Sequence, residues 1–466
     1  MDTESFRDRI ATADKKGSRI WVYPTKPKGR LYNTRSIVAY FLLAFFFIAP
    51  FLKLGGHPLI LLNILERHFI LFGLIFKPQD FYIFVLIALS LLIFVVLFTA
   101  IFGRLFCGWV CPQTIFMEMV FRRIEYWIDG NPGQQKKLDR AFWGFNKIFK
   151  RFVKHSIFIC ISLIISHFLL AFIIGMESTV NLITQPPWNH SSGFIAMMIF
   201  GFLFYGVFSW FREQACTLVC PYGRLQSVLI DSNTIVVAYD YKRGEPRGKL
   251  VKGERPKNNG DCIDCFACVR VCPTGIDIRN GTQLECINCT ACIDACNNIM
   301  KKTARPEGLV RYSSENRLSG LSKSRFTGRL FIYTFALTLL LSLSISLLMA
   351  RTKIEATVLR ASGSLYYESD NNTIRNLYTA KLTNKSFEKT PVSFRIKAPS
   401  GGSLSMVAGE IVLEAEEITE SVFFVDFPKS QLHGSSIMIT IELTSGDEVI
   451  DEITISFMAP KEEKLE

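Results

Sequence analysis

Two runs of closely spaced cysteines in the middle of the chain constrain its fold more than any other feature. Residues 262–273 read CIDCFACVRVCP and residues 286–296 read CINCTACIDAC, so both have the spacing C-x2-C-x2-C-x3-C. In two-cluster ferredoxins such a run supplies three thiolates to one 4Fe–4S cluster, and its fourth cysteine binds the other cluster. Zinc knuckles use two CxxC pairs instead, and disulfides do not require this repeated spacing. The pattern therefore predicts an α+β ferredoxin module of the bacterial type with two 4Fe–4S clusters.

The exchange of the fourth cysteines assigns the ligands of both clusters. The first cluster is predicted on Cys262, Cys265, Cys268 and Cys296, and the second on Cys286, Cys289, Cys292 and Cys272. Because such clusters accept and release one electron at a time, the chain is predicted to transfer electrons.

Five apolar stretches are long enough to cross a bilayer as helices. They are residues 36–56, 81–103, 156–175, 193–210 and 330–350. A helix needs about 20 apolar residues to span the hydrocarbon core, and the shortest stretch is close to that limit. A sixth apolar run, residues 58–76, is interrupted by charges, so we expect it to be interfacial or re-entrant. The lipid bilayer is therefore a predicted partner of a multi-pass membrane protein.

Lysine and arginine are distributed unevenly around these stretches. Residues 1–35 hold 9 of them, residues 104–154 hold 10 and residues 211–329 hold 19, whereas residues 176–192 hold none. Basic loops stay in the cytoplasm. The N-terminus and the ferredoxin module are therefore predicted on the cytoplasmic side of a bacterial inner membrane, and the C-terminal domain is predicted in the periplasm. The net charge of +12 suits anionic lipid. Nucleic acid is not a predicted partner, because no basic helix or aromatic stacking platform accompanies the charge.

The predicted fold class is a multi-domain membrane protein with five parts. They are a basic cytoplasmic arm (1–35), a four-span membrane domain (36–211), the ferredoxin domain with its linkers (212–328), a fifth transmembrane helix (329–350) and a C-terminal domain (351–466). In the last part, segments with alternating apolar residues, such as NLYTAKLTN and ESVFFVDF, are separated by turn-forming residues. This pattern predicts an all-β Ig-like sandwich of about seven strands.

A second cysteine pattern, CxxxCP, occurs where the second and fourth apolar stretches end. Its members are Cys107, Cys111 and Pro112 and, 109 residues later, Cys216, Cys220 and Pro221. Proline suits the first turn of a new helix, so the cysteine before each proline is predicted at a helix N-terminus. A thiol in that position has a lowered pKa, and basic neighbours such as Arg104 and Arg224 act in the same direction.

If the two hairpins pack together, the four CxxxCP thiols converge. Soft sulfur ligands select Cu(I), Zn(II) or iron–sulfur clusters, so these cysteines are predicted to be a metal or thiol-redox site. A lone cysteine at a helix end is commonly just a small apolar residue, but a repeat at matched depth argues against that. The sequence leaves open whether the thiols form one site or two.

Some residues outside these motifs are weaker candidates. One set follows Cys111 and consists of Met117, Glu118 and Met119; another falls on the predicted outer side and consists of His57, His68 and His190. Methionine on an apolar helix face more often serves packing, and the histidine spacing does not enforce a metal site. His167 lies within a span, where it is either a hydrogen-bonded core residue or a contact to a quinone or metal.

The order of these features resembles a known family. Four spans bearing FCGWVCP and CTLVCPYGRLQ, a doubled ferredoxin run, a fifth span and an Ig-like tail are similar to the cytochrome c oxidase accessory proteins called CcoG, FixG or RdxA, which are polyferredoxin-type membrane proteins. The resemblance covers nearly the whole chain. It implies a cupric reductase that converts Cu(II) to Cu(I) for assembly of a cbb-type cytochrome c oxidase. It also implies a cytoplasmic electron donor, and copper chaperones or transporters and oxidase subunits as partners.

Within this resemblance, the four CxxxCP cysteines are the implied catalytic and copper-binding residues, and the eight ferredoxin cysteines form the electron relay. Sulfur ligands favour Cu(I), whereas Cu(II) prefers nitrogen and oxygen, so a thiolate-rich pocket favours reduction. Two alternatives stay open. One is a quinol dehydrogenase or other electron-transfer subunit of a periplasmic reductase system, and the other is a non-enzymatic copper chaperone or redox sensor.

Overall fold

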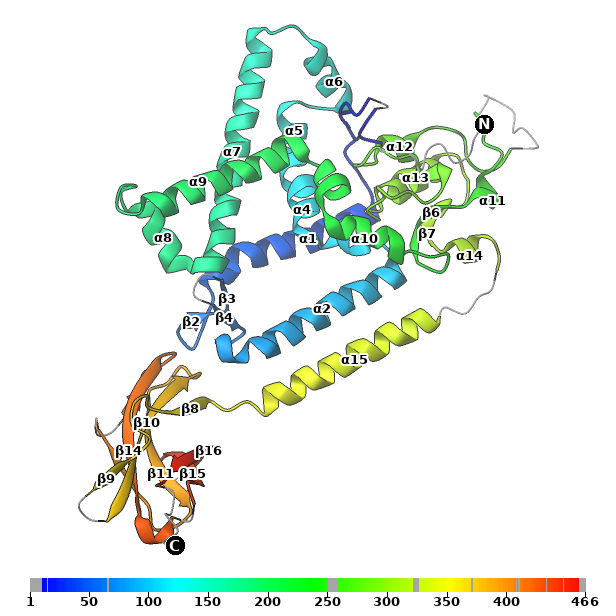
Figure 1. Cartoon of the computed structure of the whole chain (residues 1–466). Helices are drawn as coiled ribbons and strands as arrows, with labels where there is room; N and C mark the ends of the chain where they lie inside the picture. The colour runs from blue at the N-terminus through cyan, green and yellow to red at the C-terminus, as the bar shows by residue number, and fades with distance from the viewer. Residues whose placement is uncertain are drawn as a thin grey trace. The chain divides into compact units, whose positions relative to one another are not determined.

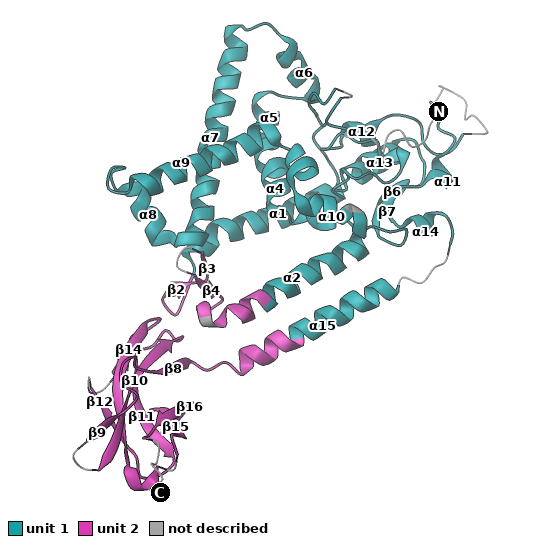
Figure 2. Cartoon of the chain, in the orientation of Figure 1, with its two compact units in different colours: residues 1–52, 86–341 teal, residues 53–85, 342–466 magenta. Residues whose placement is uncertain are grey.

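A computed structural model gives the arrangement of helices and strands along the chain (Figure 1). It describes residues 11–460 except 15, 65–66, 250–258, 322–326, 370–371, 408, 410, 433 and 447. The first ten residues of the predicted arm, Glu66 and parts of both ferredoxin linkers lie outside the described residues. The chain divides into two compact units, residues 1–52 with 86–341 and residues 53–85 with 342–466 (Figure 2).

Five helices of the described chain are long and apolar enough to cross a membrane. They are α1 (Arg30–Ile48, continued by η1, Ala49–Phe51), α2 (Phe81–Phe102), α7 (Phe145–Ile174), α9 (Ser191–Gly206, continued by η4, Val207–Phe211) and α15 (Gly328–Met349). All five predicted spans are confirmed, with two changes of bounds. The α-helical form of α1 ends before Pro50, which has no backbone donor. The helix α7 begins at Phe145, because the lysine- and arginine-rich segment before the apolar stretch also favours a helix.

Each hairpin ends in short helices that carry a CxxxCP motif. After α2 follow α3 (Leu105–Trp109), α4 (Pro112–Ile115), the π-helix η3 (Phe116–Phe121), α5 (Arg122–Ile128) and α6 (Pro132–Arg140). The helix α8 (Met176–Thr184) joins α7 to α9, and after η4 follow the π-helix η5 (Ala215–Val219) and α10 (Pro221–Leu229). Cys111 and Cys220 are the N-cap residues of α4 and α10, which confirms that each proline starts a new helix.

The two ferredoxin-type cysteine runs form loop–helix units beside a two-stranded sheet. The strand β6 (Val236–Tyr239) pairs antiparallel with β7 (Val310–Ser313), and the runs lead into α12 (Ala267–Arg270) and α13 (Ala291–Lys302). The short elements are α11 (Tyr241–Gly244), η6 (Ile278–Asn280) and α14 (Glu315–Leu318). Apolar side chains of the sheet, the loops and α13 share one core, which includes Val237, Ile278 and Ile293. The predicted α+β module is therefore present, in the same compact unit as α1, α7, α9 and most of α2.

The ferredoxin module holds the N-terminal end of α1. Asp294 of α13 accepts hydrogen bonds from the backbone N–H of Tyr32 at 2.8 Å and of Leu31 at 3.3 Å. A carboxylate in this position satisfies free amides and is favoured by the helix dipole. The segment before α1, predicted as an arm, also contacts the module, since the N–H of Thr25 donates to the carbonyl of Arg270 at 2.7 Å.

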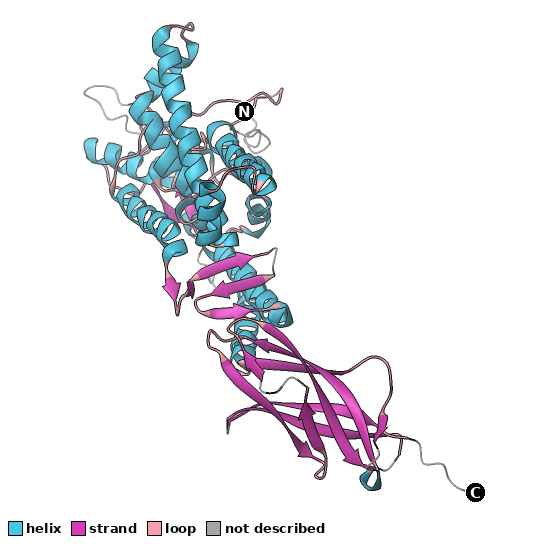
Figure 3. Cartoon of the chain, turned by 90° about the vertical axis from the view of Figure 1, so that its left-hand side faces the viewer, coloured by secondary structure: helices cyan, strands magenta, loops and turns pink. Residues whose placement is uncertain are grey.

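The C-terminal part is a sandwich of two antiparallel sheets (Figure 3). One sheet has the order β12-β14-β10-β8, with β9 also paired to β10, and the other has the order β13-β11-β15-β16. The strands are β8 (Ile354–Arg360), β9 (Tyr367–Ser369), β10 (Thr373–Asn384), β11 (Thr390–Ala398), β12 (Ser403–Met406), β13 (Ile411–Leu413), β14 (Ile418–Pro428), β15 (Ser436–Ser445) and β16 (Glu448–Met458), with a turn η7 (Lys429–Gln431) before β15.

Alternating side chains of both sheets form the sandwich core. Tyr378 of β10 lies opposite Phe423 of β14, and its hydroxyl donates to the carbonyl of Ser456 at 2.9 Å. The predicted Ig-like sandwich and its seven alternating segments are confirmed. The short strands β9 and β12 are additional, because three or four residues show too little alternation to be recognised.

The interrupted apolar segment 58–76 is a β-meander in the same unit. It contains β3 (Ile60–Asn63), β4 (His68–Leu71) and β5 (Leu74–Phe76), preceded by the pair β1 (Lys53–Leu54) and β2 (His57–Pro58) and followed by η2 (Pro78–Asp80). Buried Asp80 joins the meander to the sandwich through Arg351 at 2.6 Å and Lys385 at 2.7 Å. The re-entrant alternative is therefore wrong, since strand pairing and these ion pairs hold the segment against the sandwich.

Candidate metal centres

The four CxxxCP cysteines come together in one site. The thiol of Cys216 interacts electrostatically with those of Cys107, Cys111 and Cys220, and the thiol of Cys107 with those of Cys111 and Cys220. All four are partly buried. The question that the sequence left open is thereby answered, because both hairpins contribute to the same group of thiols.

Side chains of α10 join the two hairpins around this four-thiol site. The thiol of Cys107 donates to Oε1 of Gln226 at 3.3 Å. One turn earlier on α10, the hydroxyl of Tyr222 lies 2.6 Å from that of Thr99 on α2. The helix that follows the second motif therefore positions a cysteine of the first.

Burial favours the protonated form of three of these thiols, those of Cys107, Cys111 and Cys216, in the absence of a metal. It raises the pKa of Cys107 to about 11 and the pKa of Cys216 to about 12. Burial also raises the pKa of Cys111, because it outweighs the backbone hydrogen bonds from Thr114 and Gln113. The lowered pKa predicted for a thiol at this helix N-terminus is therefore wrong. A soft metal ion that binds here must displace protons from the sulfurs.

Arg104 lies between the four-thiol site and the second ferredoxin quartet. Its guanidinium interacts electrostatically with Cys107, Cys216 and Cys286. It also donates a hydrogen bond to the carbonyl of Leu284, just before the second cysteine run. Arg104 is therefore the basic neighbour that the sequence predicted, and it is shared by two groups of thiols.

The eight ferredoxin cysteines gather around two small cavities. One is lined by Cys262, Cys265, Cys268 and Cys296, and the other by Cys272, Cys286, Cys289 and Cys292, with Cys268 reaching both. The structure thus brings together the two quartets that the spacing assigns, including the exchange of the fourth cysteines.

Both cysteine loops adopt the same unusual backbone form. Asp264 and Phe266 have φ of 52° and 56°, and Asn288 and Thr290, at the corresponding positions, have φ of 51° and 65°. Left-handed residues within such a loop turn successive N–H groups toward one side, which makes a concavity that binds anions, iron–sulfur clusters included. The loops and their thiols therefore fit 4Fe–4S clusters, which supply one-electron redox chemistry when bound.

The eight ferredoxin thiols are arranged around cavities rather than around a single point. Within the described parts of residues 11–460, no three His, Cys, Asp or Glu side chains lie close enough to hold one metal ion. In a cubane cluster each cysteine binds a different iron, so the ferredoxin quartets need the wider spacing.

The first CxxxCP motif lies against the second cysteine loop. Gly108 follows Cys107, and a Cβ at Gly108 would overlap the carbonyl oxygen of Ile287. Cys107 packs against the apolar cluster that contains Cys289, with Cys292 beside it. The four-thiol site is therefore in direct contact with the residues that line the second cluster cavity.

The candidates near Cys111 have different surroundings. Met117 and Glu118 line a small cavity together with Cys216, and Glu118 forms an ion pair with Arg122 at 2.5 Å. Met119 accepts a hydrogen bond from the hydroxyl of Ser36 at 3.8 Å, among apolar neighbours. Met117 and Glu118 therefore face the four-thiol site, whereas Met119 serves packing.

The histidine candidates do not form the set of three that the sequence suggested. His57 pairs with Glu416 at 3.0 Å in the second compact unit, which also contains His68, whereas His190 belongs to the first unit. In α7, Nδ1 of His167 contacts the carbonyl of Leu163 one turn earlier, which favours the hydrogen-bonded core alternative.

Sequence reasoning missed a network of buried charges near the start of α7. Lys154 lies 2.7 Å from Asp129 and 3.4 Å from Glu125, and Glu125 also pairs with Arg212. The one sign of this network in the sequence was Arg212, a charged residue directly after the fourth span. Positive and negative neighbours lower the cost of burying each of these groups.

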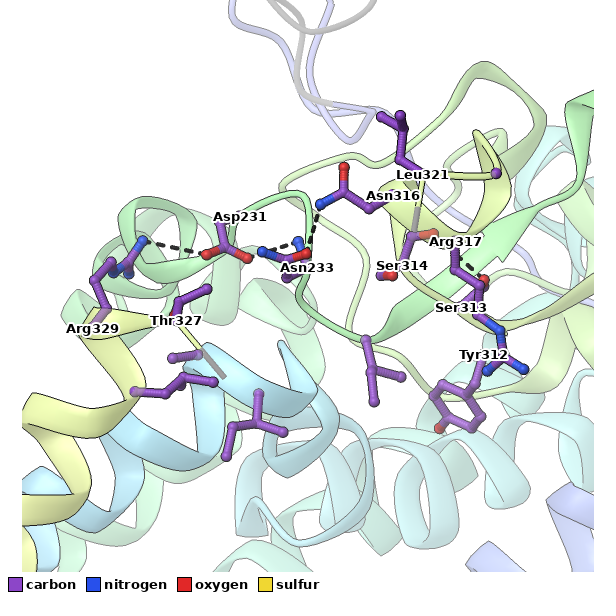
Figure 4. Close-up of a pocket in the computed structure, with 15 residues that line it drawn as sticks. Asp231, Asn233, Tyr312, Ser313, Ser314, Asn316, Arg317, Leu321, Thr327 and Arg329 are labelled. Atoms are coloured by element: carbon purple, nitrogen blue, oxygen red, sulfur yellow. Dashed lines mark hydrogen bonds and ion pairs between the residues drawn. The ribbon is translucent and has the colours of Figure 1, made fainter. Parts of the chain in front are cut away.

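A second cavity, of about 530 Å³, lies where α2 ends and α15 begins (Figure 4). Asp231 and Arg329 form an ion pair across 3.6 Å, and the amide of Asn316 donates to Asn233 at 2.6 Å. Its described lining contains no cysteine. Its lining residue Tyr312 donates a hydrogen bond to the carbonyl of Asn288 in the second cysteine loop at 3.2 Å.

Comparisons with family models of known proteins match three segments of the chain. Residues 211–315 match a 4Fe-4S dicluster domain, residues 84–133 match a 4Fe-4S binding domain, and residues 344–460 match the IG-like fold at the C-terminal of FixG. A crystal structure of a FixG-related protein from Vibrio parahaemolyticus is 18% identical, covers 23% of this chain and 97% of that chain, and has a TM-score of 0.21.

Similar full-length proteins come from two bacteria. Protein RdxB of Cereibacter sphaeroides is 31% identical over 92% of this chain and 94% of its own length. Protein RdxA of the same organism is 32% identical over 82% of this chain and 83% of its own length. Nitrogen fixation protein FixG of Rhizobium meliloti is 29% identical over 88% of this chain and 87% of its own length. Together with the five apolar helices and the dicluster domain, these matches show that the chain is an iron–sulfur electron-transfer protein of the membrane and belongs to the FixG/RdxA family.

Proposed function

We propose that this chain reduces Cu(II) to Cu(I) at the four CxxxCP thiols and supplies the Cu(I) for assembly of a cbb-type cytochrome c oxidase. One observation carries the proposal. Four thiols from two separate hairpins form a single site, and that site touches the loop of the second cysteine quartet through Gly108.

The chemistry of the site suits copper as a substrate. Cu(II) prefers nitrogen and oxygen ligands, whereas Cu(I) prefers sulfur, so binding to these thiols favours the reduced ion. Cu(I) is selected by thiolate ligands and accepts linear coordination, so two of the four thiols are enough to bind it. Protons displaced from Cys107 and Cys216 offset the charge that the ion brings into a buried site.

The location and partners follow from the same proposal. The basic loops put the four-thiol site and the ferredoxin module on the cytoplasmic side of the inner membrane, beside a cytoplasmic electron donor, and the sandwich in the periplasm. Copper chaperones or transporters and oxidase subunits are the proposed partners. The sandwich, with no cysteine between residues 351 and 466, is proposed to dock partners rather than to carry electrons.

The test is an anaerobic titration of the purified, dithionite-reduced chain with Cu(II). Reoxidation of the clusters is followed by their visible absorption, and Cu(I) by a Cu(I)-specific chelator. We expect fast, stoichiometric reoxidation in the wild type and at least about tenfold slower reoxidation when Cys107, Cys111, Cys216 and Cys220 are all changed to Ser, since the copper ligands are lost.

The matched control is Cys160→Ser, which removes an exposed cysteine of α7 outside the site. It should react like the wild type. Equal rates in the wild type and the quadruple variant, at equal iron content, would show that copper is reduced elsewhere.

A further inference from the structure

The buried charges near the start of α7 surround a cavity that the copper chemistry does not use. Its volume is about 590 Å³, within the range of pockets that hold small molecules. Its walls come from α5, α6, α7, α9, η4 and the segment before α1. Trp143 and Trp210 contribute aromatic surface, and Asp129, His155 and Tyr205 contribute polar groups.

The cations that line this cavity already have partners: Arg151 pairs with Asp139, and Lys147 donates to the backbone carbonyls of Asp139 and Ala141. Lys154 donates to Oδ2 of Asp129 at 2.7 Å, and Arg212 donates to Glu125 at 3.1 Å. A phosphate or another anion would therefore compete with carboxylates for these cations. The electrostatics of the cavity favour an uncharged ligand.

One acceptor in the cavity has no hydrogen-bond partner. Oδ1 of Asp129 is buried and unpaired, and the side chain of Asp129 is only 4% exposed. A buried acceptor without a donor costs roughly 1–3 kcal/mol, so this oxygen calls for a ligand that donates a hydrogen bond. A hydroxyl group fits that requirement, whereas a phosphate or a carboxylate does not.

The cavity lies at the level where a lipid-soluble ligand would enter. Trp143 is 75% exposed, and its neighbours Phe142 and Phe145 are 98% and 86% exposed. The apolar stretch of α7 begins only at residue 156, so the inner end of the cavity, at His155, is the part that meets the membrane interface. Deeper along α7, Nδ1 of His155 lies 2.8 Å from the hydroxyl of Tyr205 on α9, which adds a second polar pair.

We propose that this cavity binds the headgroup of a membrane quinol and takes electrons from it. One quinol hydroxyl donates to Oδ1 of Asp129, and the second faces the His155–Tyr205 pair. On oxidation the quinol loses two electrons and two protons and becomes a quinone. The two 4Fe–4S clusters, which the eight ferredoxin cysteines would hold, would accept one electron each, while Asp129 and His155 accept the protons and pass them to water.

The cavity is connected to the cysteines by packed side chains. Arg212 lines both this cavity and the small cavity beside Cys216. That small cavity shares Thr274 and Ile287 with the cavity of the second cysteine quartet. Electrons therefore have a continuous route through protein from the quinol site to the second quartet. The proposal rests on the iron–sulfur electron-transfer function, makes quinol the electron donor in place of the cytoplasmic donor proposed above, and holds whether or not copper is the final acceptor.

Binding is tested first, on the purified full-length chain in detergent. Decylubiquinone should quench tryptophan fluorescence in a saturable way, because Trp21, Trp143 and Trp210 line the cavity. Vesicles or micelles containing phosphatidylglycerol should not displace it. Displacement by phosphatidylglycerol, or the absence of saturable quenching, would overturn the proposal in favour of a lipid site or of no site.

Reduction is tested next with anaerobic decylubiquinol, which should bleach the iron–sulfur absorption. Asp129→Asn should slow bleaching at least about tenfold but keep or strengthen quenching by decylubiquinone, because an amide can donate to a quinone carbonyl whereas a carboxylate cannot. If Asp129 had only a structural role, the substitution would weaken both the bleaching by decylubiquinol and the quenching by decylubiquinone. Tyr205→Phe should also slow bleaching.

The matched control is Asp231→Asn, the same change in the cavity of Figure 4, which should leave bleaching and quenching unchanged. Iron content and Cu(II)-driven reoxidation of dithionite-reduced Asp129→Asn should equal those of the wild type. Equal bleaching in Asp129→Asn and the wild type would overturn the assignment. Failure of copper reduction with intact quinol bleaching would reject the copper proposal alone.

Discussion

The first CxxxCP motif has Gly108 between its cysteines and lies against the second ferredoxin loop, whereas the second motif has Thr217 at the corresponding position and forms the π-helix η5. In the first motif, Nε1 of Trp109 donates to the carbonyl of Asn288 at 3.3 Å. In the second motif, Cys216 instead lines a small cavity with Met117 and Glu118. Two copies of one pattern therefore supply equivalent thiols but meet different surroundings.

This difference shows how a sequence repeat can acquire two roles. The first copy connects the thiols to the iron–sulfur module, and the second completes the four-thiol site from the opposite hairpin. Three π-helices, η3, η4 and η5, lie within a few residues of the motifs. Such helices are rare and frequently occur at functional sites. On the proposed function, electrons enter through the first motif and copper binds where both meet.

The largest effect is expected from Gly108→Ala. The added Cβ would collide with the carbonyl of Ile287 and displace the loop that carries Cys286 and Cys289. We expect loss of the second cluster, so that iron and acid-labile sulfide per chain fall by about half.

Thr217→Ala is the matched change in the second motif and should keep full iron content, since Thr217 makes only weak hydrogen bonds at 3.5 Å to the turn before it. Equal iron loss in both variants, or in neither, would remove the structural distinction between the two motifs.

The next effect concerns whether the thiols act as one unit. Cys107→Ser and Cys216→Ser should each slow Cu(II)-driven reoxidation about tenfold, and the double variant should be little slower than either single one, because residues of one site are not additive. The rates are measured by stopped-flow absorption at equal iron content. If the double variant slowed reoxidation by the product of the two single factors, the thiols would instead belong to two independent sites.

A smaller effect is expected at the arginine that supports the first motif. Nε of buried Arg35 donates to the carbonyl of Gly108 at 2.7 Å, whereas exposed Arg224 donates to the carbonyl of Leu218 at 2.9 Å in the second motif. Arg35→Gln should lower the free energy of unfolding by roughly 1.5–3 kcal/mol, because a charged hydrogen bond in a buried site is lost.

Arg224→Gln should change the free energy of unfolding by less than about 0.5 kcal/mol, as is usual for exposed positions. Both are measured by the thermal loss of iron–sulfur absorption. Similar midpoints for the two variants would show that the contact of the first motif contributes no more stability than that of the second.

The smallest effect is expected from Gln226→Leu, which removes the acceptor for the thiol of Cys107. A neutral hydrogen bond contributes about 1 kcal/mol, so the thermal midpoint should fall only slightly. Copper-driven reoxidation should change less than in Cys107→Ser. A loss as large as that of the cysteine variant would mean that α10 takes part in the chemistry directly.

Local patterns predicted most of the fold. The spans, the doubled cysteine run and the alternating strands of the sandwich are each specified by spacing within one segment, so they could be recognised without contacts. The β-meander at 58–76 could not, because it is held by Asp80 through Arg351 and Lys385, far away in the sequence. The start of α7 at Phe145 was missed because basic residues hide a helix from a search for apolar runs.

The sequence by itself determined the ligand types, the cluster spacing and the repeat of CxxxCP, since these depend on residue identity and short intervals. Only the tertiary structure decided that the four thiols form one site, that Gly108 brings them against the second cluster loop, and that burial raises rather than lowers the pKa of Cys111. The same holds for the cavity around Asp129. The physical reason is that the convergence of the thiols and their removal from water depend on which segments pack together. The sequence of a repeated motif does not specify which residues each copy contacts.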